Sequence, residues 1–161
     1  MKRLLLAAVT IAALSVPAMP AAAASFTVTG SVTASCSAVT NSTIAFSSIG
    51  IQADGTLTAS QTASSAAQAS FYCNGAGTTL TLAHTAMTDG VTAPSGFTST
   101  IDFTPAVKVG GTDKQVGDGT GIAFGAQAGS LVVDARSLTA AAKPTAGSYS
   151  GSITLTLTPS T

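Results

Sequence analysis

The sequence predicts an all-β protein built as a β-sandwich. Two stretches, residues 26–35 and 149–158, alternate apolar and hydroxyl side chains along their whole length. Residues at every second position lie on the same face of a strand, so each stretch would have one apolar and one polar face. Between them, short apolar segments are separated by turn dipeptides such as Asp54-Gly55, Asn74-Gly75 and Asp89-Gly90. Seven or eight short strands with turns at this spacing are typical of a sandwich.

Residues 1–24 have the features of a secretory signal peptide. Lys2 and Arg3 precede an apolar run over residues 4–16, and small residues follow up to Ala24. An uncleaved membrane anchor is the alternative, but the apolar run is short for crossing a bilayer. We expect cleavage after Ala24, which leaves a mature chain of residues 25–161 with a net charge of −2. The mature chain is therefore expected to be exported.

The predicted strands follow one another from the N-terminal end of the mature chain. An alternating strand over residues 26–35 comes first, and shorter strands follow over 43–49, 67–73, 78–83, 98–109, 122–124, 131–135 and 149–158. The strand at 98–109 is expected to break at Pro105. Residues 56–69 are rich in Ala, Ser, Thr and Gln, and this composition is compatible with a helical turn, a strand or a loop.

Two cysteines, Cys36 and Cys73, are expected to form a disulfide. An even number of cysteines in an exported chain is typical of disulfide bonding. A redox-active pair of thiols is the competing interpretation, but such pairs usually lie close together in the sequence, as in Cys-x-x-Cys.

The composition provides few groups for chemistry. Charged residues make up 7% of the chain, the formal net charge is zero, and there is a single histidine, His84. No basic excess is present to bind nucleic acid. A structural role for His84 is favoured over catalysis, and Asp113 and Asp118 fit a glycine-rich hairpin better than a calcium loop. We therefore expect no enzyme activity, no metal site and no cofactor.

The two alternating end strands suggest an incomplete sandwich. The first strand precedes Cys36, so it need not pack on its own domain, and the last strand ends only a few residues before Thr161. A sandwich of this kind would leave an apolar strand edge unpaired, and a strand from another chain could pair with it.

Three segments resemble the secreted spore coat protein U domain and related pilin subunits of chaperone–usher fibres. They are Ser25-Phe-Thr-Val-Thr-Gly-Ser-Val-Thr-Ala-Ser-Cys36, Phe71-Tyr-Cys-Asn-Gly75 and Ala146-Gly-Ser-Tyr-Ser-Gly-Ser-Ile-Thr-Leu-Thr-Leu-Thr-Pro159. The resemblance covers the two ends of the mature chain better than its centre, residues 86–129. It implies an immunoglobulin-like sandwich that lacks its last strand, with residues 36–161 as the domain and residues 25–35 as a donor-strand segment.

The resemblance also implies roles for individual residues. The donor face would comprise Phe26, Val28, Gly30, Val32 and Ala34, and the acceptor groove would be lined by Ile153, Leu155 and Leu157. The disulfide between Cys36 and Cys73 would tie the first strand to a second one. The alternative is that residues 26–35 form an ordinary first strand within their own domain.

The predicted function is that of a secreted structural subunit of a surface fibre or coat, in adhesion or a biofilm. Its implied partners are other copies of itself or related subunits, a periplasmic chaperone and an outer-membrane usher. A monomeric secreted sandwich that acts as an adhesin or binds carbohydrate is the alternative, although the chain has no tryptophan and only two tyrosines to form a sugar platform.

Overall fold

The computed structural model describes residues 27–161, so the predicted leader and Phe26 lie outside the described residues. Residues 32–161 form one unit, and residues 27–31 belong to another, in which they have no strand. No helix occurs among residues 27–161, as the fold prediction expects. The strands are β1 (Thr62–Ser64), β2 (Gln68–Cys73), β3 (Thr79–Thr88), β4 (Phe97–Thr98), β5 (Thr100–Val109), β6 (Thr112–Val116), β7 (Gly119–Ala123), β8 (Gln127–Thr139), β9 (Lys143–Pro144) and β10 (Ser150–Thr158).

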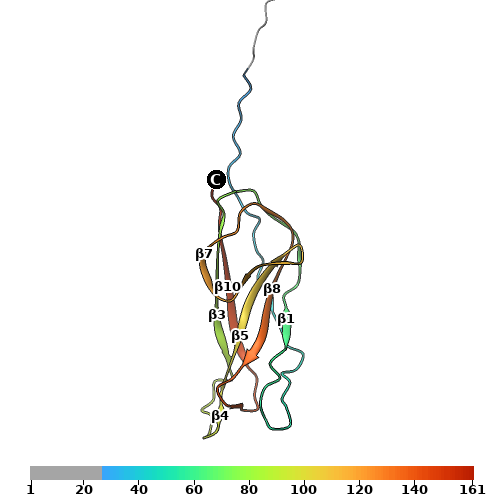
Figure 1. Ribbon diagram of the computed structural model, residues 1–161, viewed down its shortest axis with the longest axis vertical. Coiled ribbons are helices and arrows are strands. Elements are labelled where there is room, and N and C mark those ends of the chain that lie inside the picture. Colours follow the sequence, from blue (N-terminus) through green and yellow to red (C-terminus); the bar gives the residue numbers. More distant parts are fainter. Residues whose placement is uncertain (1–26) are drawn as a thin grey trace, which may run out of the picture. The chain divides into compact units, whose positions relative to one another are not determined.

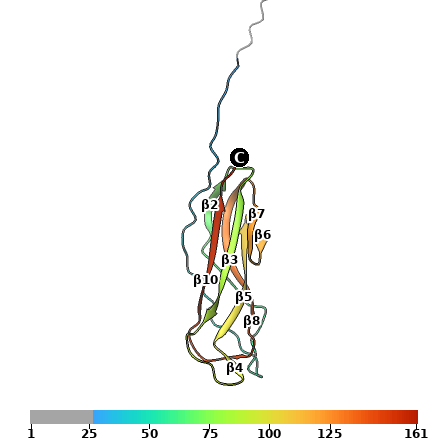
Figure 2. The ribbon, with the colours of Figure 1, turned by 90° about the vertical axis from the view of Figure 1, so that its left-hand side faces the viewer.

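The strands form antiparallel sheets in the manner of a β-sandwich, with one short parallel pair, β4–β9. β8 pairs with β1, β2 and β5, and β5 also pairs with β6. β3 pairs with β7 and with β10, and it meets β5 only at Met87–Ile101 and Thr88–Thr100. Figure 1 and Figure 2 show β3 and β10 side by side, with β5 and β8 as the neighbouring pair.

β5 continues through Pro105, so the predicted break at this residue is wrong. Along β5, the pairing changes from β3 at Ile101 to β6 at Ala106, and Pro105 lies between these two regions. A proline fits there because its missing N–H falls where β5 changes partner and no bond to a neighbouring strand is lost. The Pro105 carbonyl still accepts a hydrogen bond from the Gly117 N–H.

Two clusters of buried side chains form the core. The first contains Phe71, Cys73, Leu80, Leu82, Val107, Val109, Phe124 and Leu131. The second contains Leu57, Met87, Ile101, Phe103, Ala135 and Leu138. Ile153 packs against both clusters, so the last strand connects the two halves of the core.

Two predicted strands are absent from the structure. Residues 27–35 and 43–49 have no strand, although Ile44, Phe46 and Ile49 still pack against the second core cluster. A strand requires a partner for its backbone groups, and the alternation of side chains cannot supply one. The undecided region 56–69 contains the short strand β1, and the predicted glycine-rich hairpin is the β5–β6 turn at Gly110-Gly111, followed by β6 and β7.

Candidate functional site

A groove of about 1050 Å³ opens along one side of the sandwich. Residues 39–51 form one wall, and residues 144–155, which include the first part of β10, form the other. Met87 on β3 and Ile101 and Phe103 on β5 also line it, and these three side chains are buried. None of the residues that line the groove is charged. The groove therefore combines an apolar interior with walls rich in hydroxyl groups.

β10 lies at the edge of its sheet. It pairs with β3 alone, and no second partner is found among residues 27–161. Leu155 lies opposite Leu82, Leu157 opposite Leu80 and Ile153 opposite His84. Of the three residues predicted to line an acceptor groove, Ile153 and Leu155 line this one, and Leu157 packs instead against the first core cluster.

The wall formed by residues 39–51 is held at its two ends. The Gln68 side chain accepts a hydrogen bond from the Thr40 N–H and donates one to the Thr40 carbonyl, at 3.3 and 3.2 Å. At the other end, the Gln61 side chain accepts a hydrogen bond from the Gly50 N–H at 2.8 Å. Between these points the chain is anchored by its apolar side chains, which face the groove. The pattern of residues 43–49 predicts a strand, so this wall of irregular chain could not be predicted from it.

The predicted donor segment, residues 25–35, is largely exposed where it is described. Phe26 lies outside the described residues, Val28 is 95% exposed, and Val32 is 81% exposed. A side chain added at Gly30 would meet nothing within 4 Å. Ala34 is half-buried and lies beside Gly75. Ala34 therefore packs within residues 32–161, whereas the side chains of Val28 and Val32 are exposed.

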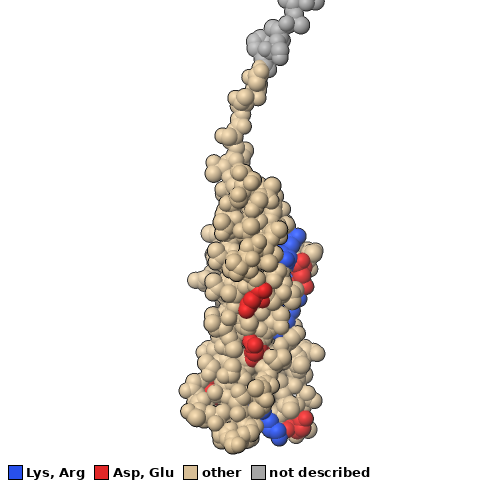
Figure 3. All heavy atoms as spheres, turned by 60° about the vertical axis from the view of Figure 1, so that its left-hand side comes forward, with Lys and Arg blue, Asp and Glu red and all other residues tan. Residues whose placement is uncertain are grey.

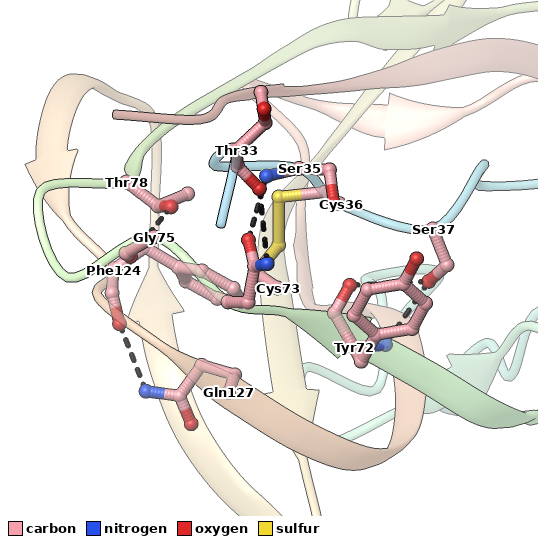
Figure 4. The surroundings of a disulfide bond; sticks show 11 residues. Thr33, Ser35, Cys36, Ser37, Tyr72, Cys73, Gly75, Thr78, Phe124 and Gln127 are labelled. Atoms are coloured by element: carbon pink, nitrogen blue, oxygen red, sulfur yellow. Dashed lines mark hydrogen bonds between the residues drawn. A yellow bond between two sulfur atoms is a disulfide. The ribbon is translucent and has the colours of Figure 1, made fainter. Parts of the chain in front are cut away.

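The predicted disulfide between Cys36 and Cys73 is confirmed. Cys36 lies opposite Cys73 in an antiparallel bridge, so the bond ties the chain that leaves the donor segment to β2. The Ser37 N–H donates to the Tyr72 carbonyl at 2.8 Å, and the Asn74 N–H donates to the Ser35 carbonyl at 3.0 Å. Figure 4 shows these two segments beside the disulfide. A disulfide of this kind indicates an oxidising compartment outside the cytoplasm.

His84 is held between two carboxylates. Its Nε2 lies 2.8 Å from Asp102 Oδ1, and its Nδ1 lies 2.9 Å from Asp118 Oδ1. Burial lowers the pKa of His84, but the hydrogen bonds with Asp118 and Asp102 outweigh it, so the net pKa is raised above its ordinary value. The ring also packs against Phe103, with the ring centroids 4.8 Å apart. Because the two carboxylates contact the two nitrogens of one ring, His84 links β3, β5 and the β6–β7 turn through ion pairs.

A second group of charges lies on β5, β6 and β8. Asp134 is fully buried and accepts from Lys108 at 2.8 Å and from Arg136 at 2.7 Å, and Arg136 also pairs with Asp113. Burial raises the pKa of Asp134, but the hydrogen bonds from its neighbours outweigh it and hold the pKa below its ordinary value. In Figure 3, most charged side chains lie in the right-hand half of the face shown. The charges of this group are paired among themselves, and none of its residues lines the groove.

Residues 27–161 contain no group of three or more His, Cys, Asp or Glu side chains placed to hold a metal ion. Within the same range, no helix is long and apolar enough to span a membrane. Comparisons of the chain with protein-family models, with curated proteins and with solved structures found no match.

Proposed function

We propose that this chain is a structural subunit of an extracellular fibre or coat, assembled when the N-terminal segment of one copy enters the groove of the next. The observation that carries the proposal is the apolar groove of about 1050 Å³ beside the unpaired edge of β10. A strand laid there would pair its backbone with β10 and place alternate side chains inside the groove. The sandwich would thereby gain the strand that it lacks.

The donor segment suits this groove in length, pattern and charge. Residues 26–32 in extended form span about 23 Å, and the part of β10 and its approach that lines the groove, residues 149–155, has the same number of residues. Phe26, Val28 and Val32 alternate with hydroxyl residues, and neither the segment nor the groove lining has a charge. Gly30 would be the third of the four positions that face the groove.

The energetics favour a long-lived contact. A fully buried Phe or Val side chain contributes about 1.5–3 kcal/mol, and each net backbone hydrogen bond about 1 kcal/mol. Three such side chains and several backbone bonds together would make dissociation slow. Before assembly, the same apolar groove would be open to water, and this is the reason for proposing a periplasmic chaperone and an outer-membrane usher as partners.

The proposal is tested with the mature chain run on a gel without boiling. Wild-type protein should give a ladder of multimers that collapses on heating, and deletion of residues 25–35 should abolish it. A double variant, V28S/V32S, retains the length of the segment and removes its apolar face, so it should also give monomers. A ladder that persists in both variants would rule out the donor role and show that multimers form through other contacts, whereas a wild-type chain that gives no ladder would favour the monomeric alternative.

A further inference from the structure

The point at which the donor segment leaves its own domain is held by one side chain, that of Asn74. Its Oδ1 accepts a hydrogen bond from the Ser35 N–H at 2.6 Å, and its Nδ2 donates one to the Thr33 carbonyl at 3.1 Å. The Asn74 backbone N–H donates to the Ser35 carbonyl. We call these three hydrogen bonds the Asn74 clamp. Figure 4 shows Thr33 and Ser35 held in this way next to the disulfide.

The clamp fixes residues 33–37 in an extended path along β2. Cys36 is bonded to Cys73, Ser37 is hydrogen-bonded to Tyr72, and Ala34 lies beside Gly75. Gly75 is itself buried, and a side chain added there would meet the Ser160 carbonyl and Ala34. Residues 33–37 therefore cannot turn back on themselves without breaking several of these contacts.

To enter the groove of its own chain, the donor segment would have to turn at this point. The wall of the groove begins at Val39, shortly after Cys36, so a donor segment that entered its own groove would have to reverse direction at about residues 33–36. If the clamp stays closed, the reversal must come earlier, at residues 30–32, because the tightest hairpins need two residues. Only Phe26 and Val28 would then reach the groove, because Val32 would form part of the turn.

We infer that Asn74 is a positioning residue that directs the donor segment away from its own groove, so that the occupant of the groove is a second copy of this chain. The inference rests on the proposed function and adds to it the reason why assembly is intermolecular. Without the clamp, the same apolar face could complete its own sandwich and leave a monomer that is unable to join a fibre. The disulfide alone would not prevent this, because it holds Cys36 and leaves residues 33–35 free to turn.

The test compares the mature wild-type chain with N74A and with Q115A as a matched control. The Gln115 side-chain amide also bonds to the backbone, donating to the Gly117 carbonyl at 3.0 Å, and Gln115 lies outside the groove lining, the contacts that hold the groove wall and the donor segment. Each protein is unfolded in denaturant with its disulfide intact and refolded by dilution. Monomers and multimers are then separated, and hydrogen exchange of residues 25–32 is measured in the monomer fraction.

The wild-type chain should give mainly multimers, and the donor segment of its remaining monomers should exchange freely. N74A should raise the ratio of monomer to multimer roughly tenfold, as expected for the loss of two hydrogen bonds that oppose reversal. The N74A monomers should protect residues 25–32 from exchange, a result that a general loss of stability would not produce. Q115A should retain the wild-type ratio.

The outcomes separate the two claims. A monomer-to-multimer ratio of N74A within about twofold of wild type, or N74A monomers with unprotected residues 25–32, would overturn the role of the clamp and leave the proposed function standing. A wild-type chain that forms no multimers would overturn the proposed function and the clamp with it.

Discussion

His84 bridges three parts of the fold through a single ring. Both ring nitrogens contact carboxylates and must both carry protons to donate to them. Both hydrogen bonds of His84 therefore form in the imidazolium form of the ring. The same contact stabilises the ionised form of Asp102, since the hydrogen bond from His84 lowers the pKa of its carboxyl. The ring lies directly opposite Ile153, a groove-lining residue, in the β3–β10 register.

The stability of the fold should therefore depend on pH through His84. A histidine whose pKa is raised in the folded state stabilises the protein below its unfolded pKa, and that contribution is lost as the pH rises through the folded pKa. Thermal denaturation is measured for the V28S/V32S chain and for the same chain with H84Q added. The substitution H84Q should lower Tm more near pH 5.5 than near pH 9. A difference in Tm that is the same at both values would show that the ion pairs contribute nothing measurable.

The ion pairs of His84 could not be predicted from the sequence. Asp102 and Asp118 are 18 and 34 positions away from His84 in the chain. Only the path of β5, which leaves β3 after Ile101, and the following β6–β7 turn bring them to the ring. The same applies to Asn74, which reads in the sequence as the first residue of a turn dipeptide. No local pattern distinguishes such residues from other polar surface residues.

At the scale of elements, the disulfide is the one covalent link between the chain that follows the donor segment and the sheet. Residues 32–61 contain no strand, so few backbone bonds hold this part of the chain to the domain. In the unfolded chain the Cys36–Cys73 bond closes a long loop, which removes conformational freedom from the unfolded state. The bond should therefore contribute strongly to the stability of the monomer.

Replacing both cysteines in the monomeric V28S/V32S background, as C36S/C73S, should lower the free energy of unfolding by about 2–5 kcal/mol. Equilibrium unfolding in urea, with and without the double replacement, measures this directly. A loss below about 1 kcal/mol would mean that hydrogen bonds and side-chain packing hold this part of the chain without the disulfide.

The strands that sequence patterns predicted well are those whose neighbours lie within the chain. β10 was expected over residues 149–158 and occurs at Ser150–Thr158, where β3 provides its partner. Residues 43–49 show a similar apolar pattern but form no strand, because no strand lies beside them. Alternation reports which face of a segment is apolar, whereas strand formation also depends on a hydrogen-bonding partner elsewhere. In the proposed assembly, the donor segment and this wall both gain such a partner only when two copies join.

At the scale of the whole molecule, no charged side chain lines the groove. The ion pairs formed by Lys108, Arg136 and His84 satisfy four of the six aspartates, and the groove lining and the donor segment contain no charged residue. Contacts made through the groove should therefore be apolar and backbone-mediated, with little contribution from long-range electrostatics.

Assembly should accordingly be insensitive to sodium chloride. Raising the salt from about 0.05 M to about 1 M shortens the screening length several-fold, yet the proportion of multimers in the mature wild-type chain should change little. Size-exclusion chromatography at each salt concentration provides the measurement. Multimers that dissociate as salt is added would point to contacts through the charged side of the molecule and away from the groove.

The central claim is that Val32 of one copy lies in the groove of another. A photoreactive p-benzoylphenylalanine in place of Val32, in a mixture of isotopically light and heavy mature chains, tests it most directly. After irradiation, mass spectrometry should identify cross-links between light and heavy chains, joined to residues 39–51 or 149–155. Cross-links confined to single chains, or cross-links between chains that fall outside these two walls, would contradict the account.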